Sequence, residues 1–203
     1  MYRERAEALA EGEDGQAVLE QFRARKDALF ATHPQSPFAP EERKAFTGLR
    51  YYPYEPSLCI EAMIEAASDQ EEAHPASGDE HPIPLRRAAR VQFMLAGRSL
   101  ELTVYWIDIY GGGLFLPFRD ATCPDESYGA GRYLFDTIKG SDFRRVSGVA
   151  SEGGGYAGGK ILLDFNYAYK PSCAYDPRWS CPLAPRVNWL PVHIRAGERK
   201  YHD

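Results

Sequence analysis

Apolar side chains between residues 14 and 33 recur at the spacing of one face of an α-helix. Charged side chains lie largely on the other faces, so the pattern predicts a single amphipathic helix. Asp14 is suited to cap its first turn, and Pro34 disfavours helical backbone at the residue before it. We expect this helix to pack across the end or side of a sheet, with a partner-binding role as the alternative. The apolar positions are Val18, Leu19, Phe22, Leu29 and Phe30.

The rest of the chain holds short aromatic, alternating or apolar stretches separated by residues typical of turns. Such stretches predict β-strands joined by tight turns. The clearest case is a hairpin in which residues 90–96 and 99–108 flank a turn at Gly97. The other predicted strands are residues 46–53, 57–65, 114–118, 129–136, 160–165 and 189–194.

The second strand of the hairpin alternates along its length, which predicts one buried face. Its expected inward positions are Leu100, Leu102, Val104 and Trp106.

Two segments have the composition of loops. Residues 66–84 are acidic and rich in Pro, Gly and Ser, which predicts a solvated loop. We expect His74 and His81 to be loop residues there rather than metal ligands. The stretch SEGGGYAGG, residues 151–159, lacks the Lys-Ser/Thr ending of a phosphate-binding loop, so we expect a flexible hairpin tip.

About eight short strands without a visible repeat predict a mostly-β fold. We expect a single-domain β-barrel or β-sandwich with an N-terminal amphipathic helix. Residues 1–43 would hold the helix and a connector, and residues 44–203 would form the mostly-β domain. The 13 Tyr, 18 Gly and 15 Pro residues agree with many short strands and turns.

The net charge of −5 argues against a nucleic-acid-binding protein, which needs a basic stripe to neutralise phosphates. A small anionic ligand remains compatible with it, because a local arginine cluster can outweigh the global sign. The chain has no apolar run of about 18 residues, so we expect no membrane span. Residues 1–10 also lack the apolar core of a signal peptide, which makes the cytoplasm the expected location. The oligomeric state stays open.

Polar side chains are dense in PFRDATCPDESYGAGRY, residues 117–133, between apolar strands. Burying such groups unpaired is costly, so they must be exposed, paired or lining a cavity. Two arginines could each present a planar fork to a carboxylate or phosphate. Alternatively, Arg119, Asp120 and Arg132 pair with each other and fix a strand crossing. The polar positions of interest are Arg119, Asp120, Thr122, Tyr128 and Arg132.

A second polar segment, LDFNYAYKPSCAYDPRWSCPLAP, covers residues 163–185 and carries two cysteines. Seven residues separate Cys173 from Cys181, which is not the spacing of a zinc knuckle. A disulfide that closes this loop and two buried thiols both fit the pattern. A metal site would need further ligands such as Cys59, Cys123 or His193, so we assign no metal, and the cofactor stays unknown.

Three strings in this chain resemble the motifs of a prokaryotic family of unknown function. FRDATCPDESYGAGRYL resembles FRDxTxGxxTYGAGRYL, and LDFNYAYKPSCAYDPRWSCPLAPRVNWLPVHIRAGERKY resembles LDFNxAYNPxCAYxxxxxCPxPPxxNxLPVxIxAGEK. KAFTGLRYYPYEPSLCIEAMIE, residues 44–65, is similar to the family's F-x-G-L-x-Y-F-P signature. The resemblance covers about residues 44–201 and implies a shared mostly-β fold and a common site, but no activity.

The polar family positions that this chain matches are Arg119, Asp120, Thr122, Tyr128, Arg132, Asp164, Asn166, Tyr169, Cys173, Cys181 and Asn188. The chain departs from the pattern at Pro124, Ser127 and Lys170, where the family usually has Gly, Thr and Asn. Lys170 adds a cation beside the expected site.

Three functions fit these observations. The first is a module that binds a small polar or anionic ligand in a pocket lined by Tyr128, Tyr169, Tyr175 and Trp179. The second is a hydrolase- or isomerase-type enzyme that uses Asp120 or Asp164 as a base beside an arginine. The third is a structural or interaction protein in which the motif residues form a hydrogen-bonded girdle. The expected ligand-binding residues are Arg119, Asp120, Thr122, Tyr128, Arg132, Asp164, Asn166, Tyr169 and Asn188.

Overall fold

The computed structural model describes residues 1–67, 72–73, 83–108, 112–137, 141, 144–150 and 156–202. For residues 72–73, 144–150 and 156–158, only the backbone is described. His74 and His81 therefore lie outside the described residues, and so do residues 151–155 of the expected hairpin tip.

The predicted amphipathic helix is confirmed as α2, Gly15–Thr32. The Asp14 side chain accepts a hydrogen bond from the backbone nitrogen of Ala17 at 2.9 Å and so caps the first turn. The helix buries Val18, Leu19 and Phe22. It also buries Lys26, although a charged side chain is expected on the exposed face of an amphipathic helix. Leu29, expected on the buried face, is 42% exposed.

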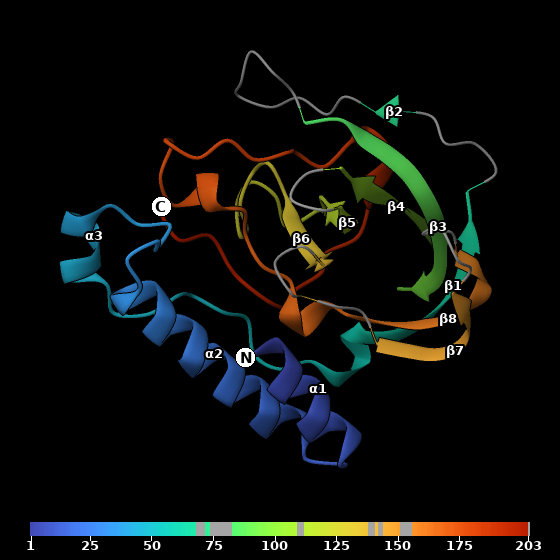
Figure 1. Ribbon diagram of the computed structural model, residues 1–203, viewed down its shortest axis with the longest axis horizontal. Coiled ribbons are helices and arrows are strands. Elements are labelled where there is room, and N and C mark those ends of the chain that lie inside the picture. The colour runs from blue at the N-terminus through green and yellow to red at the C-terminus, as the bar shows by residue number, and fades with distance from the viewer. Residues whose placement is uncertain are drawn as a thin grey trace.

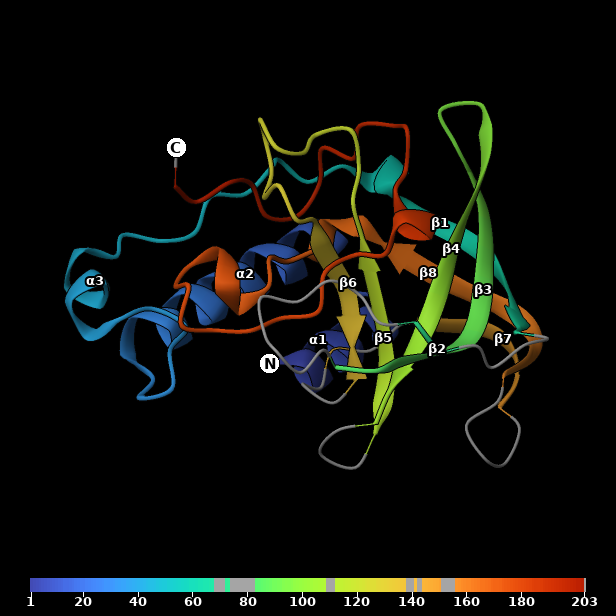
Figure 2. The same cartoon turned by 90° about the horizontal axis from the view of Figure 1, so that it is seen from above.

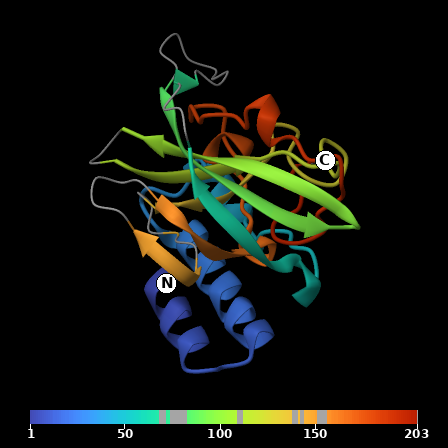
Figure 3. The same cartoon turned by 90° about the vertical axis from the view of Figure 1, so that its right-hand side faces the viewer.

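Two further helices were not predicted from the sequence. Helix α1, Tyr2–Ala10, precedes α2 and packs beside it as a helical hairpin (Figure 3). Helix α3, Pro40–Ala45, is short and starts with proline at its first turn. Within the described residues, no helix has the length and apolar character needed to cross a membrane.

The strands form one antiparallel sheet that curls into a half-barrel (Figure 1). Its order is β6-β5-β4-β3-β1-β8-β7, and the short β2 pairs with β3. This confirms the expected mostly-β fold with an N-terminal helix. The strands are β1 (Cys59–Ala66), β2 (Glu72–Ala73), β3 (Leu85–Leu95), β4 (Arg98–Ile107), β5 (Gly113–Phe118), β6 (Arg132–Asp136), β7 (Arg144–Ala150) and β8 (Tyr156–Asp164).

The hairpin of β3 and β4 is confirmed, with its turn at Ala96 and Gly97. Both turn residues have positive φ, 51° and 71°, which matches the right-handed twist of a two-residue hairpin. Leu100, Leu102 and Val104 are buried as expected. Tyr105 on the opposite face is buried as well, because a second apolar cluster covers that face.

Two predicted strands are wrong. Residues 46–53 have no strand, because Gly48 takes a φ of +127° and only Tyr51 forms a bridge, to Glu198. Residues 189–194 also lack a strand, since their backbone groups bond to a loop instead. Leu190 N donates to Arg119 O at 2.7 Å, and Ile194 N donates to the Asp120 carboxylate at 2.8 Å.

The C-terminal third of the chain links the helices to the sheet. After β8 it passes through three single-turn helices, η3 (Phe165–Tyr167), η4 (Ser172–Ala174) and η5 (Arg186–Asn188). Figures 1 and 2 show this orange and red segment between helix α2 and the curled sheet. Another single turn, η1 (Pro56–Leu58), leads into β1.

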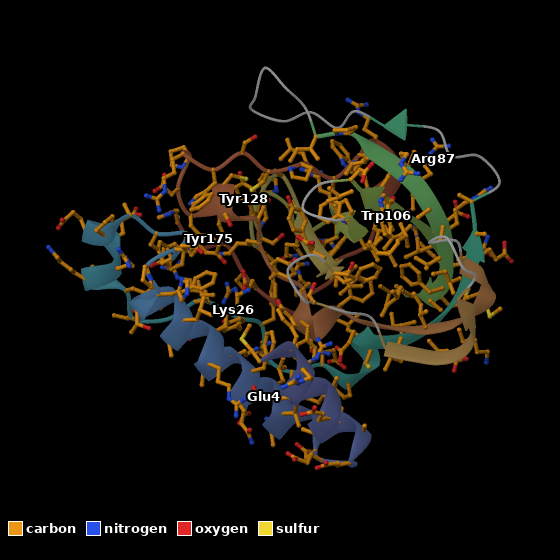
Figure 4. All side chains as sticks on the ribbon, viewed as in Figure 1. Glu4, Lys26, Arg87, Trp106, Tyr128 and Tyr175 are labelled. Atoms are coloured by element: carbon orange, nitrogen blue, oxygen red, sulfur yellow. The ribbon has the colours of Figure 1, made fainter. Side chains whose placement is uncertain are left out.

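Helix α2 is joined to the C-terminal segment by a buried ion pair. Lys26 Nζ lies 2.5 Å from an oxygen of Glu198, whose side chain is 1% exposed. The other Glu198 oxygen accepts hydrogen bonds from Tyr175 Oη at 2.6 Å and from the Lys170 backbone nitrogen at 2.9 Å. Burial alone would raise the pKa of Glu198, but the charges of Lys26 and Lys170 hold it below its usual value. Figure 4 shows Lys26 and Tyr175 between α2 and this segment.

Removing Lys26 should therefore destabilise the fold strongly. Lys26→Met leaves the Glu198 carboxylate buried without its main counter-ion, and we expect a loss of about 3 kcal/mol or more in unfolding free energy. Urea denaturation would measure it. Lys44→Met is the matched control, because Lys44 pairs with Glu41 on the exposed surface, and we expect it to cost about 0.5 kcal/mol or less. Equal losses in the two variants would contradict the role of Lys26.

Candidate functional site

Arg132, the first residue of β6, is fully buried and bonded on several sides. Its guanidinium donates to Asp120 Oδ1 at 3.0 Å, to Ile194 O at 2.8 Å and to Glu198 O at 3.2 Å. It also donates to Ala196 O. The guanidinium therefore gathers three alternate carbonyl groups of the C-terminal segment and one carboxylate into a single cluster.

Asp120 follows β5 and holds the same segment from the other side. Its Oδ2 accepts from Ile194 N at 2.8 Å, and its Oδ1 accepts from Thr122 Oγ at 3.0 Å. Thr122 Oγ in turn lies 2.7 Å from Ser127 Oγ, so the turn between them is closed by side chains. The three polar side chains are buried, and a buried polar group is stable only when it is bonded in this way.

Gly131 allows the chain to turn into β6 beside the end of β5. Its φ is +98°, and an added Cβ would lie 2.4 Å from Phe118 O. The backbone therefore approaches β5 closely at Gly131, whereas Gly129 has no positive φ.

Asn188 joins the η5 turn to two strands through its side-chain amide. Its Oδ1 accepts from Thr103 N at 2.8 Å, and its Nδ2 donates to Thr103 O at 2.8 Å and to Pro117 O at 2.7 Å. The amide takes the place of a strand partner for β4, and it is completely buried.

Asp164 and Asn166 fix the end of β8 in a similar way. Asn166 pairs with the backbone of Glu55, accepting from its nitrogen and donating to its oxygen at 2.9 Å each. Asp164 Oδ1 accepts from Asn166 N at 3.1 Å and from Nδ2 at 3.0 Å. Tyr169 extends β6 by exchanging backbone hydrogen bonds with Tyr133, and burial raises the pKa of its phenol.

The structure therefore separates the nine predicted ligand-binding residues into two groups. Seven of them bond within the fold and correspond to the girdle considered above, six through their side chains and Tyr169 through its backbone. We call this set the motif girdle: Asp120, Thr122, Arg132, Asp164, Asn166, Tyr169 and Asn188.

Arg119 and Tyr128 form the second group and are only half-buried. The Arg119 guanidinium stacks on the Trp189 ring, 4.5 Å from its centre, and its Nε donates to Gly129 O at 2.9 Å. In the part of the chain that the structure describes, the two terminal nitrogens of Arg119 donate no hydrogen bond. Trp189 is 45% exposed, and the Arg186 guanidinium lies 5.4 Å from its ring centre.

Tyr128 lies on the loop that joins β5 to β6 and is labelled in Figure 4. Its hydroxyl is 3.8 Å from the Cys173 sulfur. Burial and the neighbouring thiol raise the pKa of Tyr128 to about 12, so the phenol stays neutral near pH 7. We name the surface formed by Arg119, Arg186 and Trp189 the Arg119 face.

We expected Tyr175 and Trp179 to line one pocket with Tyr128, but both contact other parts of the chain. Tyr175 is buried among Phe30 and Phe38, and Trp179 Nε1 donates to Pro37 O at 2.9 Å. Both therefore hold the connector between α2 and α3. Tyr169 faces Lys26, whose Nζ lies 4.7 Å from its ring centre.

A groove and the four cysteines lie outside the two groups of residues described above. A polar groove of about 260 Å³ between α1 and α2 is lined by Glu4, Arg5, Phe22 and Arg25 among others, and by none of the nine predicted residues. All four cysteines belong to the described residues and are reduced thiols. Within the described ranges, no three His, Cys, Asp or Glu side chains are grouped as metal ligands would be.

Lys170 is a buried cation next to the Lys26–Glu198 pair. The residue is 3% exposed, and among the described residues its Nζ has no hydrogen-bond partner. It lies 4.7 Å from the Tyr175 ring centre and 5.1 Å from that of Tyr201. Burial lowers the pKa of Lys170 to about 8, against an opposing effect of Glu198. The sequence marked Lys170 as a departure from the family pattern, but not as a buried group.

Truncating the two motif arginines should have unequal effects on stability. Arg132→Met leaves Asp120 buried without its counter-ion, and we expect a loss of about 3 kcal/mol or more. Arg119→Gln removes one hydrogen bond and one ring contact, for which we expect about 1 kcal/mol. Urea denaturation of both variants would compare them. A loss in Arg119→Gln as large as that in Arg132→Met would contradict the division into two groups.

The lowered pKa of Lys170 predicts a stability that rises in mildly alkaline solution. A lysine in the unfolded chain has a pKa of about 10.4, whereas Lys170 in the folded protein has a pKa of about 8. Between these values the unfolded chain binds the additional proton, so stability increases with pH. The expected gain in unfolding free energy is on the order of 2 kcal/mol, and Lys170→Met should lack it. Denaturation of both proteins at about pH 7 and pH 10 tests this, and a constant difference between them would refute it.

Comparisons with known proteins place the chain in a family but give no activity. No curated protein matches it. It is 34% identical to the uncharacterised protein from gene locus rrnAC0354 of Haloarcula marismortui, whose solution NMR structure matches with a TM-score of 0.64 over 94% of this chain and 96% of that one. The family model described as "Protein of unknown function (DUF1684)" matches residues 44–199. The chain therefore belongs to the DUF1684 family of proteins of unknown function.

Proposed function

We propose that this protein binds a small anionic ligand at the Arg119 face. The proposal rests on the contacts of the Arg119 guanidinium. It is held in place by Trp189 and by Gly129 O, yet within the described structure its terminal nitrogens donate no hydrogen bond. Most of the other polar motif positions use their side-chain atoms inside the fold.

A guanidinium fixed in this way suits a carboxylate or phosphate. The planar group presents paired N–H donors that match two oxygen atoms of such an anion. Its orientation is already set by stacking, so little side-chain entropy is lost when the ligand binds. Arg186, over the same Trp189 ring, adds a second positive charge, which offsets locally the net charge of −5.

Tyr128 precedes Gly129, whose carbonyl accepts from Arg119, and offers a neutral donor on the same loop. Its pKa of about 12 keeps the hydroxyl proton in place near neutral pH. Its partner, the Cys173 sulfur at 3.8 Å, is a weak acceptor. An oxygen of the ligand would therefore be the stronger acceptor for this hydroxyl.

Binding is better supported than hydrolysis. Asp120 and Asp164, the two residues considered as general bases, are engaged in the motif girdle by hydrogen bonds to Ile194 and Asn166. Both Asp120 oxygens and Oδ1 of Asp164 therefore serve the fold. A location in the cytoplasm, where thiols stay reduced, is part of the proposal and agrees with four cysteines that form no disulfide in the structure.

Titration with inorganic phosphate and with citrate tests the proposal, with Trp189 fluorescence and backbone NMR shifts as readouts. For the reduced protein we expect saturable binding that Arg119→Gln weakens about tenfold or more, because a charge-assisted hydrogen bond is lost. Arg98→Gln is the matched control, since it makes the same charge change on the exposed β3–β4 turn, and it should leave the affinity unchanged. Equal affinity in Arg119→Gln and wild type, or no saturable binding of either anion, would refute the proposal.

A further inference from the structure

Arg186 and Trp189 are held in a fixed relation by the single turn η5. Trp189 N donates to Arg186 O at 3.1 Å and closes the turn. Asn188 lies between them in the chain, is completely buried, and donates through its side-chain amide to Thr103 O and Pro117 O. The backbone that carries Arg186 is therefore anchored to strands β4 and β5.

Arg119 is attached to the same segment through its own backbone. Its nitrogen donates to Asn188 O at 3.0 Å, and its oxygen accepts from Leu190 N at 2.7 Å. These two bonds flank Trp189, with which Arg119 forms a parallel bridge. The backbones of Arg119 and Arg186 are therefore fixed with respect to each other.

The two guanidinium groups share the Trp189 ring as a support. The guanidinium carbon of Arg119 lies 4.5 Å from the ring centre, and that of Arg186 lies 5.4 Å from it. The separation of the two carbons therefore cannot exceed these distances taken together. A cation–π contact also restricts the directions in which an arginine side chain points. A single small molecule can therefore reach both groups.

This pair of like charges has no acidic partner in the part of the chain that the structure describes. Among those residues, neither Arg119 nor Arg186 forms an ion pair with a carboxylate, and the Arg186 side chain donates no hydrogen bond. Two positive charges held near one ring repel each other, and a negative charge placed at each of them removes that repulsion. The arrangement therefore favours a ligand with more than one anionic group.

We propose that the ligand of the Arg119 face carries two anionic groups joined by a short linker, one bound by Arg119 and the other by Arg186. This inference rests on the proposed anion binding at the same face and names its ligand class. Each guanidinium offers paired N–H donors to one carboxylate or phosphate. Once the first group is held, the second binds at a high effective concentration.

The fixed separation predicts one optimal linker length. A shorter linker does not reach both guanidinium groups, and a longer one loses more conformational entropy when both ends are held. Trp189 is 45% exposed, so its ring offers apolar surface to the methylene groups of such a linker. A series of straight-chain dicarboxylates is therefore a suitable set of probes.

The test is calorimetric titration of the reduced full chain with malonate, succinate, glutarate and adipate near neutral pH, with the Trp189 indole N–H shift as a second readout. Sulfate is the matched ligand control, because it carries the charge of a dicarboxylate on a single centre. We expect one dicarboxylate to bind at least about tenfold more tightly than sulfate. Arg119→Gln should weaken the binding of both.

Arg186→Gln separates the second contact from the effect of overall charge. It should bring the ratio of dicarboxylate affinity to sulfate affinity close to one, because the second anionic group loses its partner. Arg186 is exposed, so the variant should fold as wild type does, which its backbone NMR spectrum would verify. Arg98→Gln, the matched control, makes the same charge change on the β3–β4 turn and should leave the ratio unchanged.

The outcomes distinguish this inference from the proposed function. Sulfate binding that Arg119→Gln weakens, with no dicarboxylate preferred over sulfate, would overturn the ligand with two anionic groups and leave anion binding at the Arg119 face intact. A preferred dicarboxylate whose affinity ratio survives Arg186→Gln would overturn the role of Arg186. No saturable binding of sulfate or of any dicarboxylate would overturn both proposals.

Discussion

A guanidinium enclosed by protein needs a partner for its charge and for its donors. Arg132 finds the charge partner in Asp120, and its terminal nitrogens find further acceptors in the C-terminal segment. It holds the carbonyl groups of residues 194, 196 and 198 together with the Asp120 carboxylate. This contact fixes a segment that has no strand of its own. It also brings Glu198 to the position where Lys26 of α2 and Tyr175 meet its carboxylate. Helix α2 is thus bound to the sheet through a sequence of buried polar contacts that starts at Arg132.

The same arrangement explains why Arg119 differs from Arg132. The backbone of Arg119 bonds to Asn188 and Leu190, so the residue is part of the same contact between β5 and the C-terminal segment. Its side chain, however, points along the exposed Trp189 ring rather than into the interior. One arginine of the motif therefore stabilises the fold, and the other is left at the surface with a fixed orientation and open donors. A site whose reactive group is held by a rigid framework is a common arrangement in binding proteins.

Local patterns predicted part of this fold. The β3–β4 hairpin, helix α2 with its Asp14 cap and the strand β8 follow from periodicity and turn residues within short windows of sequence. The failures arise where contacts between distant residues decide the structure. Residues 189–194 are apolar enough for a strand, but their hydrogen bonds go to Arg119, Ala121 and Asp120. Lys26 carries a charge that predicts exposure, and only Glu198, 172 residues away, explains its burial.

The segments that hold the motif girdle and the Arg119 face could be singled out from the sequence, but the division between the two could not. Dense polar residues between apolar strands, and the resemblance to a family, marked these segments. Whether an arginine such as Arg132 faces a ligand or a carbonyl group depends on where the C-terminal segment lies, and no local pattern contains that information.

The central claim is that Arg132 belongs to the interior and Arg119 to a binding surface. The most direct measurement is an NMR spectrum of the side-chain N–H groups of ¹⁵N-arginine-labelled protein, recorded during solvent exchange and during phosphate titration. We predict that the Arg132 protons exchange slowly and do not shift with phosphate, whereas the Arg119 protons exchange fast and shift as phosphate binds. A phosphate-dependent shift at Arg132 with none at Arg119, or rapid exchange at both, would contradict the account.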